Sequence, residues 1–498
     1  MSRKRIAIVG SGVSGLGALW TLKNTDHEVH LYESESRLGG HTNTAIYKGK
    51  SGDIPVDTGF IVMNTATYPN LIAFLKHLKI DTVPTEMTFG ISRDQGAFEW
   101  AGTSLDAIFA QRENILKPSM WRMIFDIVRF NQSSLDLLTN STVSPDLTIG
   151  EYLDREGYSA SFRDDYLIPM TACVWSTGPD KCALEFPAVT LIRFLWNHHL
   201  LSTITTRPSW LTIPGGSKRY IDTVLRDFPP DHVHLSSPVT SLHNTPSGSV
   251  LLTLASGAQQ EYDNVLLATH GNQAHAIVHS SATPTENTIL SAFATTPNTA
   301  YLHSDLTLMP TRRNTWAAWN YLTTTPSPKS LPDNPAHAPA GALSKVSLTY
   351  NMNILQHIPA SHGDILVTLN PPHPPAPALT QATYEYAHPL YNPAMVAAQE
   401  RLAEIQGTRG VWYAGAWTGY GFHEDGFTSG LRAGVAMGGR VAWEGGRVVD
   451  SKYSRGQKPV RTWTDHVLRI VLEAIQILIV LVVGMGRARA VGKMDKAA

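Results

Sequence analysis

The start of the chain alternates between short apolar runs and a glycine-rich turn. Lys4 to Val9 is apolar enough for a buried strand, and GSGVSG, Gly10 to Gly15, follows at once. The pattern then predicts a helix from about Leu16 to Asn24 and a second strand from Glu28 to Tyr32, which ends in Glu33. A strand, three glycines, a helix, a strand and an acid in this order predict a Rossmann-like dinucleotide-binding unit.

Each glycine of this turn has a separate physical role. Gly10 permits the tight turn, Gly12 lets the backbone approach a pyrophosphate, and Gly15 allows the helix to pack closely on the strand. The free N–H groups and positive dipole end of the helix then face the phosphates. A terminal acid about twenty residues further on accepts hydrogen bonds from a ribose diol. The other cofactor contacts predicted here are Val13, Ser14, Glu33 and Ser34.

The next segment, SESRLGGHTN from Ser34 to Asn43, resembles the flavin-containing amine oxidase superfamily and related desaturases. In that family an arginine and a Gly-Gly pair extend the cradle along FAD, so the resemblance implies FAD rather than NAD. Arg37 can reach a phosphate with two hydrogen bonds, and paired glycines expose backbone N–H groups. DTGF, Asp57 to Phe60, resembles the family segment that passes near the flavin. The residues added to the predicted cofactor site are Arg37, Gly39, Gly40, His41 (where relatives often have arginine), Thr58 and Gly59.

Later segments resemble the rest of the same family. SWLTIPGGSKRYIDTVL, Ser209 to Leu225, HVHLSSPVTSL, His232 to Leu242, and YDNVLLAT, Tyr262 to Thr269, occur in the family's order. In relatives a residue near Val239 meets the adenine through its backbone. VWYAGAWTGYGF, Val411 to Phe422, reads as a buried strand that meets a glycine-rich turn. The resemblance covers most of residues 4–445.

The implied fold is α/β: a Rossmann-like FAD-binding domain of amine-oxidase type with an inserted α+β substrate domain and a C-terminal helix. The FAD domain is expected from residues 1–90, 206–290 and 401–450. The substrate domain is expected from a helical part, 91–205, and an antiparallel sheet, 291–400, with a mobile Pro- and Ser-rich loop at 323–344. The C-terminal helix is expected at 460–486.

The loop GYGFHEDG, Gly419 to Gly426, places three ionisable residues ahead of a helix. Consecutive side chains point in different directions, so no metal site is expected there. Asp425 is predicted as the helix N-cap. Two interpretations stay open: a structural cradle for the flavin, or a role for His423 or Glu424 near the isoalloxazine. The cofactor contacts predicted around this loop are Gly415, Glu424, Asp425, Gly426, Phe427 and Ser429.

The GFHEDG motif also resembles a less characterised subfamily of FAD-binding proteins. Its relatives are encoded beside, or fused to, methyltransferases similar to cyclopropane-fatty-acid synthases, which suggests lipids as the substrate class by association only.

The candidate substrate contacts are two aromatic residues and a histidine. Trp417 and Tyr420 resemble the family segment that carries an aromatic ring of the substrate sandwich, although packing against the flavin's dimethylbenzene edge fits equally well. His423 is the third catalytic candidate. Lys218 and Lys345 are nearest in order to the lysine that many amine oxidases place near the flavin N5. Helical spacing predicts core packing for Trp121, Ile124, Phe125 and Val128, while His198 and His199 lie about 100° apart on a helix and form no ligand pair.

Composition excludes several classes. The formal net charge of −1 over 498 residues gives no reason to expect a nucleic-acid partner. The two cysteines, Cys173 and Cys182, provide neither a disulfide framework nor a cysteine-rich zinc site, and they fit a reducing, intracellular location. Neither suggests a cysteinyl flavin link, whereas a histidyl link through His41 or His423 stays open. No cleavable signal is visible at the N-terminus.

The C-terminal segment from Thr462 has a polar stripe on an otherwise apolar helix. Its uncharged run, Ala474 to Gly486, is shorter than the ~18–20 residues that span a bilayer. We expect attachment at a membrane interface, with a helix docked on the protein's own body as the alternative. In the first case Arg487, Arg489 and Lys493 would meet anionic headgroups.

The sequence therefore predicts an FAD-dependent oxidoreductase that takes a hydride from a small hydrophobic or amphipathic substrate. O2 or another acceptor would reoxidise the flavin. A lipid desaturase or double-bond isomerase fits this description. The alternatives are a conventional flavin amine oxidase and a flavin-binding protein without turnover.

Overall fold

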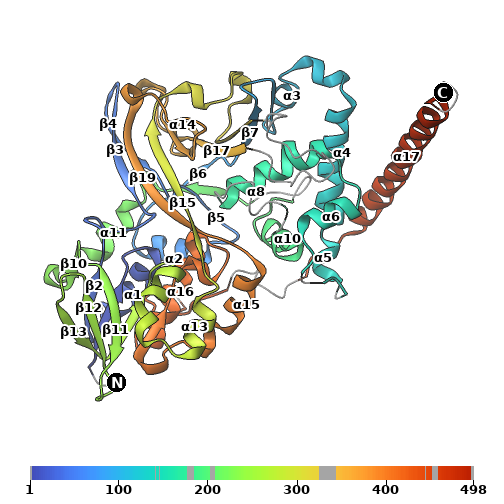
Figure 1. The fold of residues 1–498 in the computed structure, drawn as a ribbon. Coiled ribbons are helices and arrows are strands. Elements are labelled where there is room, and N and C mark those ends of the chain that lie inside the picture. The colour runs from blue at the N-terminus through green and yellow to red at the C-terminus, as the bar shows by residue number, and fades with distance from the viewer. Residues whose placement is uncertain are drawn as a thin grey trace.

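The computed structural model describes residues 3–140, 142–144, 146–175, 184, 186–201, 208–324, 344–443, 445–450 and 458–494. Cys182 and nearly all of the loop expected at 323–344 lie outside these ranges. A lower body carries the N-terminus, an upper body is built on a long sheet, and a helix projects to one side (Figure 1).

The lower body is built on a parallel sheet of five strands. Its order is β10 (Val233–His234), β2 (Glu28–Tyr32), β1 (Arg5–Val9), β14 (Asn264–Leu267) and β20 (Val411–Tyr413). In the register of this sheet, Ile8 lies opposite Leu31 on one side and Leu266 on the other. All three side chains are fully buried, as expected for a parallel sheet whose two faces are covered. The two predicted strands at the start of the chain are confirmed.

Two helices from opposite ends of the chain pack closely on this sheet. The first, α1, covers Val13–Leu22 and so begins three residues before the expected Leu16; the second, α16, covers His423–Ala436. A Cβ added to Gly430 would lie 1.9 Å from the carbonyl oxygen of Ser14, so the two backbones are nearly in contact. The glycines of α16 thus bring the C-terminal motif beside the N-terminal one.

Smaller sheets and helices complete the lower body. The antiparallel sheet contains β11 (Val239–Asn244), β12 (Val250–Leu254) and β13 (Gln259–Tyr262). The other small sheets pair β3 (Thr44–Gly49) with β4 (Gly52–Asp57), and β9 (Trp210–Thr212) with β5 (Met63–Asn64) and β6 (Val83–Thr85). The helices are α2 (Pro69–His77), α11 (Lys218–Leu225), α12 (Gly271–Val278), α13 (Pro284–Leu290) and α15 (Pro393–Arg401).

The upper body is built on a sheet of seven strands. Their order is β19 (Thr380–Pro389), β15 (Thr295–His303), β18 (Leu366–Leu369), β17 (Ser344–Asn351), β16 (Trp319–Thr324), β7 (Phe89–Arg93) and β8 (Phe98–Ala101). The strands expected between 291 and 400 are present. β7 and β8 correct the expectation that residues 91–205 are helical from their start. β7 pairs in parallel with β16, so this long-range pairing decides its conformation.

The helices of the upper body lie mostly to the right of this sheet (Figure 1). They are α3 (Leu105–Ile108), α4 (Pro118–Ser133), α5 (Asp136–Thr139), α6 (Ile149–Arg155), α7 (Ala160–Phe162), α8 (Ile168–Trp175), α10 (Ala188–Asn197) and the short α14 (Met352–Leu355). Trp121 was expected in the core but is 51% exposed. The buried face of α4 instead carries Met120 and Met123 together with Asp126, whose carboxylate binds Arg122 and Arg129. The apolar spacing alone did not reveal this buried ion-pair face.

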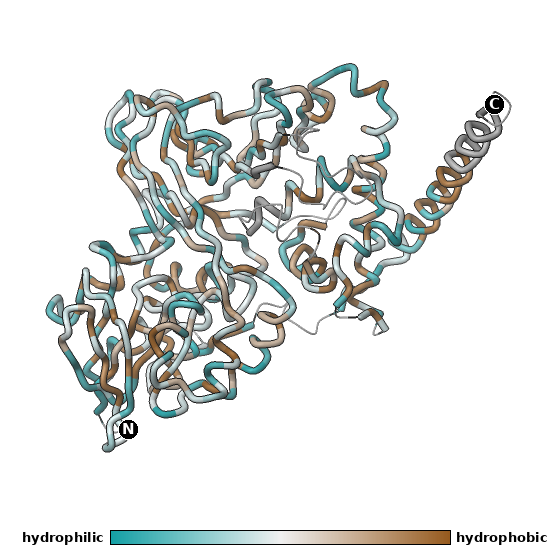
Figure 2. The backbone as a smooth tube through the Cα atoms, in the orientation of Figure 1, coloured by the Kyte–Doolittle hydropathy of each residue, from teal (hydrophilic) through white to brown (hydrophobic). Residues whose placement is uncertain are grey.

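The last helix, α17 (Trp463–Met494), extends away from both bodies (Figure 1). Its first turns contact the upper body: Arg469 pairs with Asp136 at 2.6 Å, and Leu472 is 5% exposed. The apolar residues from Ile475 to Val482 stay on the surface, and they form the brown section of the projecting tube in Figure 2. Docking on the protein's own body, the alternative considered above, is therefore limited to the first turns. In the stretches that the structure describes, no helix has the length and apolar character needed to cross a bilayer.

Candidate active site

A cavity of about 700 Å³ lies between the two bodies. One end is formed by the carboxyl ends of the parallel strands, the glycine turn and the start of α1. The predicted cofactor residues that line it are Gly10, Gly12, Val13, Ser14, Glu33, Ser34, Gly39, Gly40, His41, Gly59, Val239 and Gly415. The structure brings most of the predicted cofactor site together in one place, at the strand ends where open α/β sheets bind ligands.

The glycine turn fits a dinucleotide backbone. A Cβ added to Gly12 would meet no atom within 4 Å, so this position opens into the cavity. A Cβ on Gly10, which has φ of +101°, would lie 2.6 Å from the carbonyl oxygen of Ala268, and one on Gly15 would lie 1.9 Å from that of Gly10. Two glycines therefore allow close packing, while the third leaves room for a phosphate beside the start of α1.

Glu33 is fixed at the end of β2 by its own surroundings. Its Oε2 accepts hydrogen bonds from the backbone N–H of Ser11 at 2.9 Å and from the Ser11 hydroxyl. Its Oε1 accepts from the N–H of Glu35 at 3.0 Å and from the Ser34 hydroxyl at 3.2 Å. The side chain is 8% exposed and lines the cavity, which suits a rigid acceptor for a ribose diol.

Several predicted cofactor residues do not line the cavity: Gly15, Arg37, Thr58, Glu424, Asp425, Gly426, Phe427 and Ser429. Arg37 donates to the carbonyl oxygen of Gly40 at 2.9 Å and so shapes the turn. The Thr58 hydroxyl lies 2.7 Å from the Tyr386 hydroxyl. Ser429 Oγ accepts from the N–H of Gly415 at 2.9 Å. These last three residues do not form the cavity surface but make hydrogen bonds to the segments that do.

The three ionisable residues of the GFHEDG loop point in three directions. His423 lines the cavity. The two carboxylate oxygens of Glu424 accept from the N–H groups of Asn70 and Leu71, each at 2.9 Å, and therefore cap the start of α2. Asp425 was expected as the N-cap, but α16 begins at His423, which makes Asp425 its third residue. The Asp425 carboxylate accepts from the N–H of Phe422 at 3.0 Å and closes the loop onto the helix.

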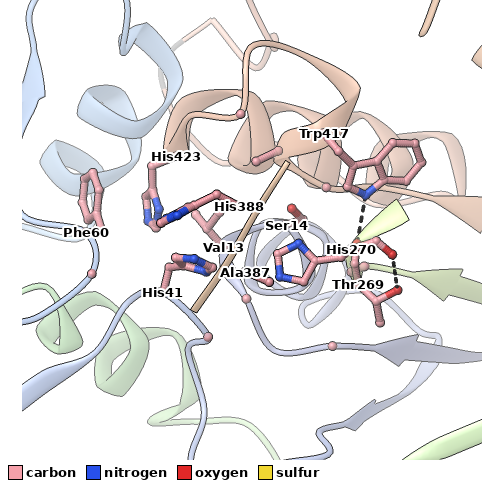
Figure 3. Close-up of a pocket in the computed structure, with 18 of the residues that line it drawn as sticks. Val13, Ser14, His41, Phe60, Thr269, His270, Ala387, His388, Trp417 and His423 are labelled. Atoms are coloured by element: carbon pink, nitrogen blue, oxygen red, sulfur yellow. Dashed lines mark hydrogen bonds between the residues drawn. The ribbon is translucent and has the colours of Figure 1, made fainter. Parts of the chain in front are cut away.

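Four histidines line the cavity: His41, His270, His388 and His423 (Figure 3). The ring centre of His41 lies 5.1 Å from that of His388 and 5.9 Å from that of His270. His423 stacks on Phe60 with centres 3.7 Å apart. Burial lowers the pKa of His388 to about 4 and that of His423 to about 3, and burial also lowers the pKa values of His41 and His270. All four are therefore neutral at pH 7.

His270 and His388 had no predicted role in the site. His270 directly follows the segment YDNVLLAT, so its place at the end of a predicted strand was a usable signal. His388 lies near the end of β19 without a local motif. Among the described residues, no group of His, Cys, Asp or Glu has an arrangement that could hold a metal.

The aromatic candidates separate into one on the cavity and one off it. Trp417 lines the cavity, and its Nε1 donates to the carbonyl oxygen of Thr269 at 2.9 Å (Figure 3). Tyr420 does not line it and packs near Phe194, with ring centres 6.1 Å apart. Lys218 is exposed and pairs with Asp222, away from the cavity, and the side chain of Lys345 lies outside the described part of the chain.

The opposite end of the cavity is built from apolar and aromatic side chains. They are Ile61, Val62, Met87, Phe194, Leu200, Trp210, Trp319 and Tyr350, with His198 beside them. A second void of about 230 Å³ shares Met87, His198, Leu200 and Trp210 with it. Among the described residues that line the main cavity, the carboxylates are Glu33 and Glu35, both at the glycine end. Burial lowers the pKa of His198 to about 4, so the described residues that line this end of the main cavity carry no charge at pH 7. Glu86 lines the second void.

Comparison with known proteins identifies the family. The model of the flavin-containing amine oxidoreductase family matches residues 13–341, more than half of the chain. A protein of Mycobacterium tuberculosis named as a flavin-containing monoamine oxidase is 25% identical over 226 residues, 43% of this chain and 46% of that protein. The chain thus spans about half the length of the curated relatives it matches. It belongs to the flavin-containing amine oxidoreductase family, and FAD is the cofactor that its glycine turn fits.

Solved structures show the same fold. A fatty acid isomerase from P. acnes that produces CLA aligns with a TM-score of 0.56 at 14% identity, covering 87% of this chain and 99% of that one. Cyclohexylamine oxidase from Brevibacterium oxydans aligns with a TM-score of 0.59 at 14% identity, covering 88% and 99%. The predicted α/β fold with a Rossmann-like FAD domain is confirmed.

Proposed function

We propose that this protein is an FAD-dependent oxidoreductase whose substrate is a small hydrophobic or amphipathic molecule, with lipid desaturation or double-bond isomerisation as its reaction. The observation that carries the proposal is the uncharged aromatic and aliphatic lining of the cavity opposite the glycine turn. Such a lining stabilises a hydrocarbon chain by removing its surface from water.

The residues of the chain have distinct tasks in this proposal. Bound FAD supplies a two-electron acceptor. The glycine turn, the start of α1 and Glu33 hold the dinucleotide, as in other Rossmann-like folds. Phe194, Trp210 and Trp319 exclude water from the opposite end. The neutral histidines line the same cavity and provide hydrogen-bond donors and acceptors without net charge.

A conventional amine oxidase using O2 is the second candidate, because the monoamine oxidase relative and the structural similarity to cyclohexylamine oxidase both point to amines. The cavity lining does not favour an amine substrate. A substrate that enters as an ammonium ion loses its hydration, and this cost is offset by a carboxylate or a similar partner. Among the described residues that line the cavity, the carboxylates are Glu33 and Glu35, both at the glycine end, and Glu86 lines the adjoining smaller void.

The test is anaerobic mixing of the purified holoprotein with two panels: unsaturated fatty acids and their phospholipids, and primary and secondary amines. We expect loss of the visible flavin absorbance with lipids, or an unchanged spectrum with a shifted double bond found by mass spectrometry of the products. Loss of absorbance with amines alone would identify the amine oxidase. No response and no product in either panel would favour a flavin-binding protein without turnover.

The projecting helix supports a membrane-associated substrate. The apolar side chains exposed on it are Val467, Ile470, Val471, Ile475, Ile477, Leu478, Val480, Leu481 and Val482. Those that come after Gln476 lie all round the helix. The basic residues Arg487, Arg489 and Lys493 follow them in the sequence. An apolar helix with a basic end suits the interface of an anionic bilayer.

Truncation after Gln476 tests this attachment, because it keeps the turns that contact α4 and removes the exposed section. We expect the full chain to float with vesicles of phosphatidylcholine and phosphatidylserine and the truncated chain to remain behind. Equal flotation of both proteins, or of neither, would exclude the helix as an anchor.

A further inference from the structure

His388 is held in one orientation by a chain of amide hydrogen bonds. The backbone N–H of Thr299 donates to Asn370 Oδ1 at 3.0 Å, so the other end of that amide is its NH2 group. Asn370 Nδ2 donates to Asn298 Oδ1 at 2.6 Å. Asn298 Nδ2 then donates to the carbonyl oxygen of Thr296 at 3.1 Å and faces His388 Nδ1 at 2.8 Å. Both amides are oriented by backbone groups whose donor or acceptor role is fixed.

This chain determines the tautomer of His388. Because Asn298 Nδ2 can only donate, His388 Nδ1 must accept and carries no proton. A neutral imidazole then has its proton on Nε2. Protonation of both nitrogens would place an N–H group against the Asn298 NH2 group, which agrees with the pKa of about 4 that burial gives His388.

The Nε2–H group is open to the cavity. It makes no hydrogen bond to any residue that the structure describes, and it is not among the buried side-chain atoms that lack a partner. His388 lines the cavity, and its ring lies 5.1 Å from that of His41. His41 directly follows Gly40, where an added Cβ would lie 3.4 Å from the Gly12 Cα. His388 therefore lies on the cavity wall close to the segment that carries the glycine pair.

We infer that His388 is a neutral hydrogen-bond donor to the ring system of bound flavin, with its Nε2–H presented by Asn298 and Asn370. The ring gains electron density when it is reduced, and a hydrogen bond to an atom that becomes more negative stabilises the reduced form. A hydrocarbon substrate has no acceptor along its chain, so the cofactor is the partner on this wall. Asn298 is a positioning residue, because it acts through His388.

The tautomer is tested first, on holoprotein with 15N-labelled histidine. Comparison with the spectrum of His388→Gln assigns the two signals of His388. We expect a protonated Nε2 and an unprotonated Nδ1 at pH 7 in the wild-type protein. In Asn298→Asp, whose carboxylate can only accept, Nδ1 should become protonated. A wild-type His388 that is protonated on Nδ1 at pH 7 would overturn the inference.

The donor role is tested by the two-electron midpoint potential of the bound flavin. In His388→Phe, loss of the donor should make reduction less favourable by about tenfold, about 30 mV for a two-electron couple. His388→Gln retains an N–H donor and should recover most of this change. His373→Phe, at an exposed histidine outside the cavity, is the matched control and should leave the potential unchanged.

Asn298→Asp adds a charge of its own, so it is measured both in the wild-type and in the His388→Phe background. If Asn298 acts through His388, the two shifts differ by about the effect of His388→Phe itself. Equal shifts in both backgrounds would overturn the inference. So would a His388→Phe variant whose equilibrium constant for flavin reduction is within twofold of the wild-type value. No substrate enters these measurements, so failure of the lipid proposal leaves their outcome unchanged.

Discussion

The two ends of the cavity are built from different parts of the polypeptide. At the glycine end the backbone forms the surface: Gly12 leaves open space, and Gly10 and Gly15 let other backbone atoms approach. At the opposite end side chains form the surface, from Ile61 and Met87 to Tyr350. A backbone-built site tolerates few residue types at a few consecutive positions, whereas a side-chain-built site can be assembled from any elements that meet in space.

The buried histidines of the cavity should make the apoprotein sensitive to acid, which is the largest effect we expect. The pKa values of His198 and His388 are lowered to about 4 and that of His423 to about 3, below the ~6.5 of an unfolded chain. Above pH 6.5 both states are neutral. As the pH falls from 6.5 toward 4, the unfolded chain binds protons that the folded chain does not, so stability falls by about 1.4 kcal/mol per pH unit for each histidine.

Urea unfolding of the apoprotein between pH 7 and 4 measures this dependence. His423→Gln should flatten the slope below pH 6.5 by about the contribution of one histidine, about 1.4 kcal/mol per pH unit. The exposed His373→Gln should keep the wild-type slope. A slope that is the same in all three proteins would show that His423 does not contribute to the acid sensitivity.

Gly12→Val tests the backbone-built end. The new side chain meets no protein atom at its Cβ, so the apoprotein should keep its melting temperature within a few degrees. The same side chain occupies the space expected for the pyrophosphate, and FAD affinity should fall more than about 100-fold, ~2.7 kcal/mol. Fluorescence titration with FAD measures this loss. Gly430→Ala is the contrasting variant, because its Cβ would lie 1.9 Å from the Ser14 carbonyl oxygen and should destabilise the apoprotein itself by about 1–3 kcal/mol.

Met87→Asp tests the side-chain-built end. A carboxylate among apolar side chains is costly to bury without a partner, so the affinity for a fatty-acid substrate should fall about 30-fold, ~2 kcal/mol, while FAD affinity stays within about twofold. Leu116→Asp, at a position that is 86% exposed, is the matched control. A parallel loss of FAD affinity in Met87→Asp would mean that the two ends are not separate sites.

The same contrast explains what the sequence could predict. The glycines, Glu33 and the succession of strand, helix and strand could be predicted, because a tight turn and a close approach leave a local pattern of residues. The seven-stranded sheet was predicted in part, since β7 and β8 depend on pairing with the distant β16. His388 and Asn298 lie on neighbouring strands at a separation of 90 residues, and no local pattern connects them. Glu424 was expected ahead of the helix as a cofactor contact, but it is the second residue of α16 and faces α2, because a side chain's direction depends on the exact residue at which its helix begins.

Glu33→Gln should have a moderate effect at the backbone-built end. The amide keeps the size of the side chain but replaces one acceptor oxygen by an NH2 group, which faces the donors that now hold the carboxylate. FAD affinity should fall about tenfold, ~1.4 kcal/mol, with no change in affinity for FMN, which lacks the adenosine ribose. An equal loss for both flavins would mean that Glu33 acts by holding the turn rather than by binding ribose.

Val239→Ala should have the smallest effect. It tests most directly whether the backbone or the side chains form the cavity surface at the adenine end. Val239 lines the cavity at the start of β11, and the family resemblance implies contact with adenine through its backbone rather than its side chain. The backbone pairs with Leu254 of β12 in either variant. FAD affinity should therefore change less than about threefold, ~0.6 kcal/mol, although the loss of two methyl groups costs the fold about 1 kcal/mol. A tenfold loss of affinity would show that side chains also form the surface at the adenine end.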